Sequence, residues 1–445
     1  MNRRKFLKQS SLVTTGLAVS PTLFAQFNGY DPDLPKSDFS GKVLIIGAGA
    51  AGLYAGYTLQ RGGYDFEILE ASDRIGGRMG KHEGFADHTI DLGAQWLHGK
   101  RSIAADLARK NGFKFKKDKS DMYFLFHGNL TDQTPSDVTS IFRDSFAKDI
   151  SFADYAKKQG YGDDYQYIVQ ATAGSYGADA DKISVKWTSI EEDEWSSGNT
   201  DYKFRESYWD VINKGIAQPI GDKIRLNTAV DSIDYSGEKI QVEDTSGKTY
   251  TADKVIITVP ITILQSAEIA FNPVLPEQKV AAFKKIGMGP GMKVFLKFSE
   301  HFYRGNTIGG KVCAAYADDK EGKDGTDNVL LAFAMGDQAK SLSKLGSDEA
   351  IAKALLAELD EIYDGRASAS FLDKLVIDYT NMPFIKGAYS YSAIGIGNAR
   401  SVAAKDIDQK LYFAGEAMNV RGHHQTVHGA LETGFDKVVK ILEGN

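Results

Sequence analysis

The stretch V-L-I-I-G-A-G-A-A-G, residues 43–52, constrains the fold of this chain more than any other part of the sequence. A run of apolar and β-branched residues leads into a glycine-rich turn, and small apolar residues follow it at helical spacing. Gly47 permits the tight turn, Gly49 lets a phosphate approach the backbone, and Gly52 lets the helix pack close to the strand. These residues predict the strand, turn and helix that open a dinucleotide-binding α/β domain.

A second strand is expected from Tyr64 to Glu70, which makes the segment the start of a βαβ unit with a parallel sheet. Glu70 lies 18 residues after Gly52, where its carboxylate can accept hydrogen bonds from a ribose 2′-hydroxyl. The phosphates would lie against the start of the helix near Ala51, because unpaired N–H groups and the helix dipole favour negative charge there. Together these features predict dinucleotide binding.

Length and composition indicate a globular protein of two domains. A chain of 445 residues exceeds the size at which single cores stop growing, and no low-complexity tract interrupts it. The net charge is −6 without a basic stripe, so nucleic acid is not an expected partner. Cys313 is the only cysteine, which excludes an internal disulfide and a cysteine-ligated metal cluster.

Residues 1–25 have the order of charged, apolar and small residues that is typical of a secretory signal. The paired Arg3 and Arg4 and the weakly apolar run from Ser11 to Ala25 predict a signal of the twin-arginine type, with a chance basic patch as the alternative. We therefore expect the twin-arginine export machinery to carry the folded protein to the periplasm. No other segment has about 18 consecutive apolar residues, and the chain stops just after its last predicted helix, so no membrane anchor is expected after signal removal.

The rest of the chain predicts a nucleotide-binding domain that a second domain interrupts twice. The expected elements are helices within 117–216, strands within 224–260 and at 292–298, a helix at 348–363, and a closing strand and helix at 410–415 and 427–442.

A second glycine doublet with an arginine, in L-E-A-S-D-R-I-G-G-R-M (69–79), offers further donors to a long diphosphate-containing cofactor. The stretch 43–79 resembles the flavin-dependent amine oxidase superfamily, which includes monoamine and polyamine oxidases. Four further segments are similar to that family in the same order, namely 91–99, 255–276, 291–298 and 411–434.

The resemblance implies an α/β fold with a Rossmann-type FAD-binding domain in three segments and an α+β substrate domain. The FAD-binding domain would comprise residues 40–116, 217–290 and 398–445, and the substrate-binding domain residues 117–216 and 291–397.

The resemblance also implies which residues bind FAD. They are Gly47, Gly49, Ala51, Gly52, Glu70, Gly77, Arg78, Gly93, Ala94, Gln95, Val230, Gly415, Glu416, Thr426 and Val427. Among them, residues 93–95 would follow the flavin edge, Val230 would contact the adenine and Glu416 would bind the ribityl or ribose part. Cys313 does not fall in the motif by which monoamine oxidases tether flavin, so FAD is expected to be bound without a covalent bond.

Lys293 is the first candidate for a catalytic residue. A lysine in an apolar strand is usually a surface cation. In the family the matching lysine reaches flavin N5 through a water, where an ammonium can stabilise charge on the reduced flavin. Lys297 would lie on the same face of the strand, and the motif M-K-V-F-L-K-F favours Lys293 for this role.

The expected substrate wall departs from the family. Tyr389 matches one member of the aromatic pair that encloses the amine in monoamine oxidases, and Tyr379 stands where the family commonly has tryptophan. The opposing position falls on Thr426, so the pair is incomplete. Trp96 and Trp187 are candidates for a replacement wall.

His98 completes W-L-H-G, a pattern similar to animal polyamine and spermine oxidases, where the histidine faces the substrate. Its imidazole could take a proton from the substrate amine before oxidation, and a structural histidine is the alternative. Amino-acid oxidases of the superfamily carry an arginine in this segment to bind a carboxylate. This chain has Gln95 and Trp96 there, so a substrate with a free α-carboxylate is disfavoured.

Three histidines stand together in H-H-Q-T-V-H, residues 423–428. His424 and His428, four residues apart, would suit a metal pair on a helix, but no third ligand has zinc-like spacing beyond His423, so no metal is predicted. Instead His423, His424 and Gln425 are expected to line the cavity near the flavin ring, which favours a substrate more polar or longer than a simple arylalkylamine.

The sequence thus predicts an FAD-dependent oxidase or dehydrogenase of primary or secondary amines, polyamines included. The neutral amine would lose a hydride from its α-carbon to flavin N5, and the imine would hydrolyse. Reoxidation would use O2, giving hydrogen peroxide, or a periplasmic electron acceptor such as a cytochrome or quinone. Two alternatives stay open: a desaturase or dehydrogenase of the same fold acting on a carbon–carbon bond, and a non-catalytic flavoprotein redox partner.

Overall fold

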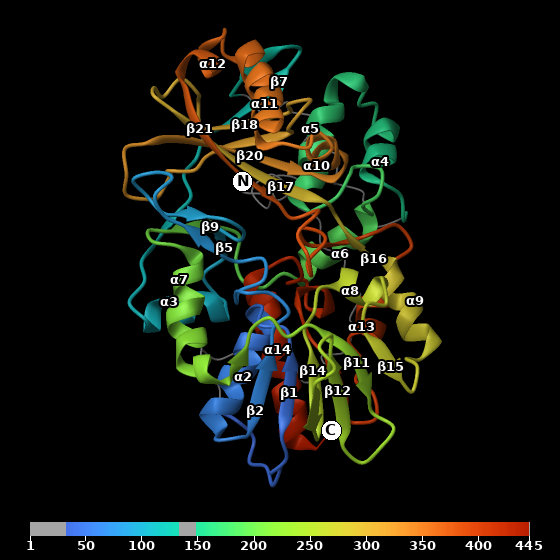
Figure 1. Cartoon of the computed structure of the whole chain (residues 1–445). Helices are drawn as coiled ribbons and strands as arrows, with labels where there is room; N and C mark the ends of the chain where they lie inside the picture. Colours follow the sequence, from blue (N-terminus) through green and yellow to red (C-terminus); the bar gives the residue numbers. More distant parts are fainter. Residues whose placement is uncertain (1–32, 133–147, 445) are drawn as a thin grey trace.

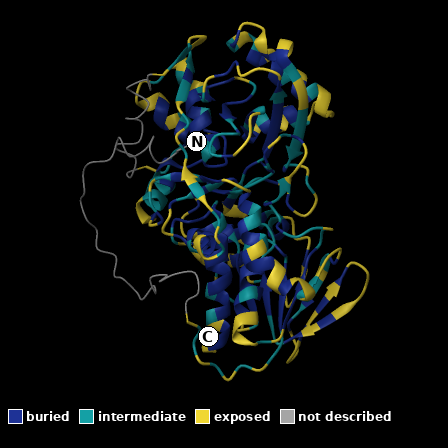
Figure 2. Cartoon of the chain, turned by 90° about the vertical axis from the view of Figure 1, so that its left-hand side faces the viewer, coloured by how far each residue is buried: buried dark blue, intermediate teal, exposed yellow. Residues whose placement is uncertain are grey.

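The structure is a computed structural model that describes residues 33–132 and 148–444. The predicted signal at 1–25 lies outside the described residues. Two bodies are stacked along the long axis of the molecule, one around β1 and β2 and the other around β17 and β20 (Figure 1). Buried residues fill the interior of both bodies, while the outer faces of their helices are exposed (Figure 2). Among the described helices, none combines the length and apolar character needed to cross a membrane.

A five-stranded parallel sheet forms the centre of the first body. Its strands are ordered β10 (Ile224–Arg225), β2 (Phe66–Leu69), β1 (Val43–Ile46), β14 (Lys254–Ile257) and β23 (Leu411–Phe413). All four residues of β1 and of β2 are buried, because a parallel sheet is covered on both faces. The predicted α/β fold is therefore confirmed, and the strands of this one sheet come from three distant parts of the chain.

Two helices cover one face of this sheet side by side, α2 (Ala50–Gly62) and α14 (Val427–Glu443) (Figure 1). A Cβ at Gly434 would lie 2.2 Å from the carbonyl oxygen of Ala51, so only glycine allows this close approach. A Cβ at Gly52 would lie 2.0 Å from the carbonyl oxygen of Gly47. Because Gly52 has no Cβ, α2 can pack this close to the turn after β1. The first and the last helix of the described chain are thus directly packed.

A smaller four-stranded sheet packs on the other side of the parallel sheet. Its order is β13 (Thr249–Ala252), β12 (Ile240–Asp244), β11 (Val230–Asp234) and β15 (Ala270–Asn272). Alternate residues of β12 are buried and exposed, as expected for a strand with one face on a core. Ile240 and Val242 share that core with Leu44 and Val255 of the parallel sheet.

The second body is built on a seven-stranded mixed sheet. Its order is β21 (Phe371–Asp378), β17 (Gly291–Phe298), β20 (Asn328–Met335), β19 (Ala315–Asp318), β18 (Asn306–Ile308), β7 (Met122–Phe126) and β8 (Asn129–Thr131). The helices α10 (Gly336–Ser343) and α11 (Asp348–Ile362) share a core with one face of this sheet, and α5 (Gln166–Ser175) contributes to a second core with β18 and β19.

Shorter elements complete the described chain. They are β3 (Lys81–His82), β4 (Ile90–Asp91), β5 (Trp96–His98), α3 (Ile103–Lys110), β6 (Phe115–Lys117), α4 (Phe152–Lys158), α6 (Val185–Glu194), β9 (Asp201–Phe204), α7 (Tyr208–Ile212), α8 (Ile261–Gln265), α9 (Glu277–Lys285), β16 (Ile286–Met288), α12 (Arg366–Ser370), β22 (Ser390–Ser392) and α13 (Ala399–Ala403).

The chain returns to the first body earlier than the predicted boundary at residue 217. The strand β9 pairs with β5 and β6, and the side chains of Phe204, Tyr208 and Ile212 lie in the same core as Val43 of the central sheet. Part of the predicted substrate segment 117–216 therefore belongs, by its packing, to the dinucleotide-binding body.

Candidate active site

A cavity of about 840 Å³ lies between the two bodies and is lined by residues of both. One end meets the glycine turn after β1 and the end of β2, and the other end meets the strands β17 to β20 of the mixed sheet. This volume falls within the range of small-molecule and cofactor sites.

Every residue predicted to bind FAD except Gly52 lines this cavity, and so do the four candidate catalytic residues. The lining includes Gly47, Gly49, Ala51, Glu70, Gly77, Arg78, Gly93, Ala94, Gln95, His98, Val230, Lys293, Tyr379, Tyr389, Gly415, Glu416, Thr426 and Val427. Gly52 lies below the turn, where its lack of a side chain lets α2 approach the strand.

The glycine turn leaves the start of α2 open to the cavity. Gly47 has a φ of 103°, a conformation that favours glycine. A Cβ at Gly49 would meet nothing within 4 Å, because this position faces the cavity and not protein. The first N–H groups of a helix lack intrahelical partners, so this end of the cavity suits a phosphate group.

Glu70 is buried at the end of β2 and holds the turn in place. Its Oε2 accepts a hydrogen bond from the Ala48 N–H at 2.7 Å. Its Oε1 accepts from the Ser72 N–H at 3.0 Å and from the Ser72 hydroxyl at 2.7 Å. The carboxylate is thereby fixed beside the glycine turn, where a dinucleotide site has the acidic residue that binds a ribose hydroxyl.

Arg78, which is partly exposed, forms an ion pair with the buried Glu416 and so joins an early and a late part of the chain. Arg78 Nη1 lies 2.9 Å from Glu416 Oε1, and the Ser390 hydroxyl donates to Glu416 Oε2 at 2.8 Å. Burial opposes the charge of Glu416, but Arg78, Arg400 and Ser390 outweigh it and lower the pKa of Glu416 to about 2. The carboxylate is therefore ionised and fixed at neutral pH.

The segment 93–95 passes close to the arginine that precedes it. A Cβ at Gly93 would lie 1.8 Å from the Arg78 carbonyl oxygen and 2.8 Å from the Tyr379 hydroxyl, so glycine is required there. Gln95 is buried, and its Nε2 has no hydrogen-bond partner within the described parts of the chain. A buried amide donor that faces a cavity suits a ligand with acceptor atoms, and the flavin ring carries carbonyl oxygens and ring nitrogens. The lining residues therefore fit FAD.

Lys293 lies in the cavity wall on β17 and is 3% exposed. Its Nζ donates to the Asp91 carbonyl at 2.9 Å and to the Gly93 carbonyl at 2.8 Å, and it also contacts Gln95 Oε1. Burial lowers the pKa of Lys293 from its usual 10.5 to about 7, against the opposing influence of Asp319 and Asp91. The lysine can therefore change charge near neutral pH.

Lys297, the alternative on the same face, does not line the cavity. Its Nζ donates to Asp327 at 2.6 Å and to the Phe85 carbonyl at 3.2 Å. Side chains alternate between the two faces of a strand, so Lys293 and Lys297, four residues apart, lie on the same face of β17. Only Lys293 lies near enough to the other body to line the cavity.

A buried charge cluster behind Lys293 was missed by the sequence analysis. Lys323 Nζ lies 3.0 Å from Asp319 and 3.5 Å from Asp91, and His88 Nε2 lies 3.3 Å from Asp319. Burial opposes the charge of Lys323, but Asp319 and Asp91 outweigh it and raise its pKa. In the sequence this lysine ends the run D-D-K-E-G-K (318–323), which has the pattern of a solvated charged loop.

His98 and the two tyrosines line the substrate end of the cavity. His98 Nδ1 lies 2.8 Å from Asp201 Oδ1, which orients the imidazole. The Tyr389 hydroxyl donates to the Gly174 carbonyl at 3.1 Å. Burial raises the pKa of Tyr379 to about 12, so its hydroxyl stays protonated. Tyr389 therefore contributes its ring to the cavity, while its hydroxyl is bonded to the end of α5.

The expected replacement wall is half correct. Trp96 lines the cavity and donates from Nε1 to Asp118 at 2.9 Å. Trp187 is not among the lining residues, and its Nε1 donates to Asp149 at 3.2 Å. Thr426, which stands at the opposing aromatic position, is the N-cap of α14, and its hydroxyl accepts from the Gly429 N–H at 3.0 Å.

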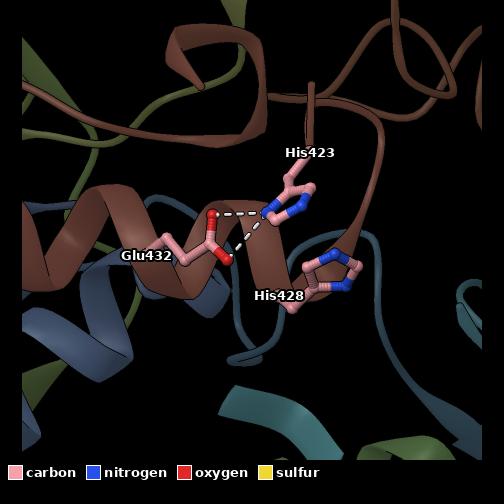
Figure 3. A group of neighbouring side chains, drawn as sticks. All are labelled: His423, His428 and Glu432. Atoms are coloured by element: carbon pink, nitrogen blue, oxygen red, sulfur yellow. Dashed lines mark hydrogen bonds and ion pairs between the residues drawn. The ribbon is translucent and has the colours of Figure 1, made fainter. Parts of the chain in front are cut away.

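His423 and His424 were predicted to line the cavity, and this prediction is wrong. His423 Nδ1 lies 2.9 Å from both oxygens of Glu432 (Figure 3). His424 Nε2 lies 3.2 Å from Glu191. Only Gln425 of the three expected residues lines the cavity. Gln425 has a φ of 66°, and this left-handed residue reverses the chain just before α14, which turns the preceding histidines away.

His424 and His428 are not the metal pair that their spacing suggested. His424 contacts Glu191, whereas His428 Nε2 lies 3.1 Å from the Ser197 hydroxyl. The residues that converge are His423, His428 and Glu432, whose ligand atoms lie within 4.8 Å of one another (Figure 3). Hydrogen bonds to Glu432 and Ser197 account for this arrangement, and the expected lack of a metal stays a prediction.

The family profile described as flavin containing amine oxidoreductase matches residues 50–215 and 168–442. The chain belongs to this family. It is 28% identical over 98% of its length to human lysine-specific histone demethylase 2, and 30% identical over 92% of its length to the probable polyamine oxidase 4 of Arabidopsis thaliana. The chain spans 57% of the demethylase, about half of its length, and 90% of the polyamine oxidase.

Two solved structures share the fold of this amine oxidoreductase. A variant of putrescine oxidase matches 92% of the chain and all of its own length with a TM-score of 0.77 at 19% identity. Cyclohexylamine oxidase from Brevibacterium oxydans matches 92% of the chain and 99% of its own length with a TM-score of 0.77 at 21% identity. The predicted family, the flavin containing amine oxidoreductases, is confirmed.

Proposed function

We propose that this protein is an FAD-dependent oxidase or dehydrogenase of primary or secondary amines. The observation that carries the proposal is the position of Lys293, buried in the wall of a cavity whose other end is the glycine turn and Glu70. FAD would be bound without a covalent bond. Cys313 is buried outside the cavity lining, where its thiol donates to the Ala315 carbonyl.

FAD, when bound, supplies the acceptor for the hydride that leaves the α-carbon of the amine. The residues of the chain prepare the substrate for that step. An amine is a cation at neutral pH and must lose a proton before it can donate a hydride. His98 lines the cavity, and because its Nδ1 is held by Asp201, its Nε2 would accept this proton.

Lys293 and the apolar wall set the electrostatics of the site. The Nζ of Lys293 donates to two carbonyls and contacts Gln95 Oε1, and these contacts fix its position in the cavity wall. Phe333, Met335 and Trp96 exclude water from the same region, which strengthens every charge interaction there.

Flavin reduction by amines tests this proposal. Purified protein should be yellow, and anaerobic addition of cyclohexylamine, phenethylamine, putrescine or spermidine should bleach the flavin band for at least one amine. Bleaching by none of them at full flavin occupancy would overturn amine oxidation and favour a reaction at a carbon–carbon bond or a redox-partner role. Colourless protein that takes up no FAD would overturn the cofactor assignment.

The electron acceptor and the location of the protein complete the proposal. Reoxidation would use O2 or a periplasmic carrier, and the measurement of hydrogen peroxide formed per amine consumed distinguishes them. Export to the periplasm rests on the sequence of residues 1–25, with its paired arginines.

A further inference from the structure

The substrate end of the cavity is walled by neighbouring strands of the mixed sheet. Lys293 of β17 lies opposite Phe333 of β20, and Ala315 of β19 lies opposite Ile308 of β18. These residues line the cavity together with Asn306, the first residue of β18. Three strand spacings of about 4.8 Å separate β17 from β18, so the wall extends roughly 14 Å away from Lys293.

Among the residues that the structure describes, none that lines this wall has an acidic side chain. Beyond Gly291, Met292 and Lys293 of β17, the strand residues that line it are Asn306, Ile308, Ala315, Tyr316, Ala317, Phe333 and Met335. The carboxylates that do line the cavity, Glu70, Asp73, Asp231, Glu268 and Glu416, all come from the dinucleotide-binding body. Asp201, the partner of His98, is buried and is not part of the lining.

The carboxamide oxygen of Asn306 is a buried polar atom of this wall without a hydrogen-bond partner among the described residues. Asn306 is buried, with an exposed fraction of 3%, and it lines the cavity. A buried carboxamide without a partner is costly, so this position suits a ligand that completes its hydrogen bonds.

We propose that the substrate is an amine with a single positive charge and an uncharged body, and that Asn306 binds a neutral hydrogen-bonding group on that body. This inference rests on the proposed amine oxidation. A second ammonium at the wall would lose its hydration and find no carboxylate among the described residues that line it, which makes diamines and polyamines poor substrates. A hydroxyl or amide group at the same place would pair with the carboxamide of Asn306 at no cost in charge.

Matched amines of equal chain length test the charge selection. Hexylamine, aminohexanol and hexamethylenediamine differ only in the group at the far end. We expect kcat/KM for hexamethylenediamine to be at least 100-fold below that for hexylamine, and kcat/KM for aminohexanol to equal or exceed it. Equal rates with the diamine and the monoamine would overturn the inference, while the proposed function would stand.

The substitution Asn306→Asp tests the residue by a gain of activity. It places a carboxylate at the wall, so kcat/KM for hexamethylenediamine should rise at least 10-fold relative to hexylamine. Asn328→Asp is the matched control, because this substitution adds the same charge to the same sheet at a position outside the cavity lining. It should leave the ratio of kcat/KM for hexamethylenediamine to that for hexylamine unchanged. An Asn306→Asp protein that holds FAD and keeps the wild-type ratio would overturn the role of Asn306.

The substitution Asn306→Leu provides an independent measurement in case the charged variant fails to fold. It removes the hydrogen-bonding group at nearly constant volume, so the preference for aminohexanol over hexylamine should fall at least 5-fold. An unchanged preference would overturn the hydrogen bond. If wild-type protein with bound FAD oxidises none of the three amines nor cyclohexylamine, the proposed function fails, and this outcome is distinct from loss of selectivity.

Discussion

Replacement of Lys293 by methionine tests whether the cavity lysine is forced toward its neutral form. Lys293 is 3% exposed, and burial lowers its pKa to about 7 from 10.5. In the unfolded chain the lysine stays protonated up to its usual pKa. Between pH 7 and about 10.5 the unfolded state therefore binds one more proton than the folded state, and the stability of the protein rises with pH in this window.

The size of this contribution follows from the shift in pKa. One pKa unit corresponds to about 1.4 kcal/mol, so the whole window is worth roughly 5 kcal/mol. Lys293→Met removes the titration together with three contacts of Nζ. The lost contacts change the free energy of unfolding by the same amount at each pH, whereas the titration changes it by about 1.4 kcal/mol per pH unit.

Denaturant unfolding of the flavin-free protein at pH 7.5, 8.5 and 9.5 measures this slope. The stability of the wild type relative to Lys293→Met should rise by about 3 kcal/mol over the two units. Lys297→Met is the matched control, because it removes a lysine from the same strand outside the cavity. Stability differences that stay constant with pH for Lys293→Met would refute the burial argument for this lysine.

Three further perturbations test other parts of the structure. Arg78→Met leaves the buried Glu416 carboxylate without its ion-pair partner. Thermal unfolding should therefore show a free energy of unfolding that is lower by about 3–5 kcal/mol, and a decrease below about 1 kcal/mol would contradict the pairing. Tyr389→Phe removes a hydroxyl that donates to the Gly174 carbonyl. The free energy of unfolding should fall by about 1 kcal/mol, while KM for the amine stays unchanged. A large rise in KM would instead indicate that the hydroxyl contacts the substrate. Replacement of Arg3 and Arg4 by lysine should retain the protein in the cytoplasm, as measured by fractionation, and unchanged export would argue against a twin-arginine signal.

The local parts of the site could be predicted from the sequence. The glycine turn, Gly52 and Glu70 lie within one βαβ unit, where short sequence distances fix the geometry. Lys293 was predicted because the strand around it resembles the family. Its position in the cavity wall agrees with that choice over Lys297.

The parts that could not be predicted depend on contacts between distant segments or on irregular backbone. The cluster of Asp91, Asp319 and Lys323 forms only when β4 and the loop after β19 come together, and no local pattern marks it. The directions of His423 and His424 depend on the backbone before α14, and a helical repeat does not apply to residues outside the helix. The domain boundary was placed too late for the same reason, since the packing of β9 is not visible in its sequence.

The packing of α14 on α2 determines when the cofactor site can first exist during synthesis. The strand β23 and the helix α14 come from residues 411–443, so a ribosome must release more than 360 residues after α2 before α2 can pack on the whole of α14. Contacts of such long sequence separation make folding slow. A nascent chain that ends before residue 411 would lack an outer strand of the central sheet, Glu416 and the start of α14, and we therefore expect FAD to be acquired only after the residues of α14 have left the ribosome.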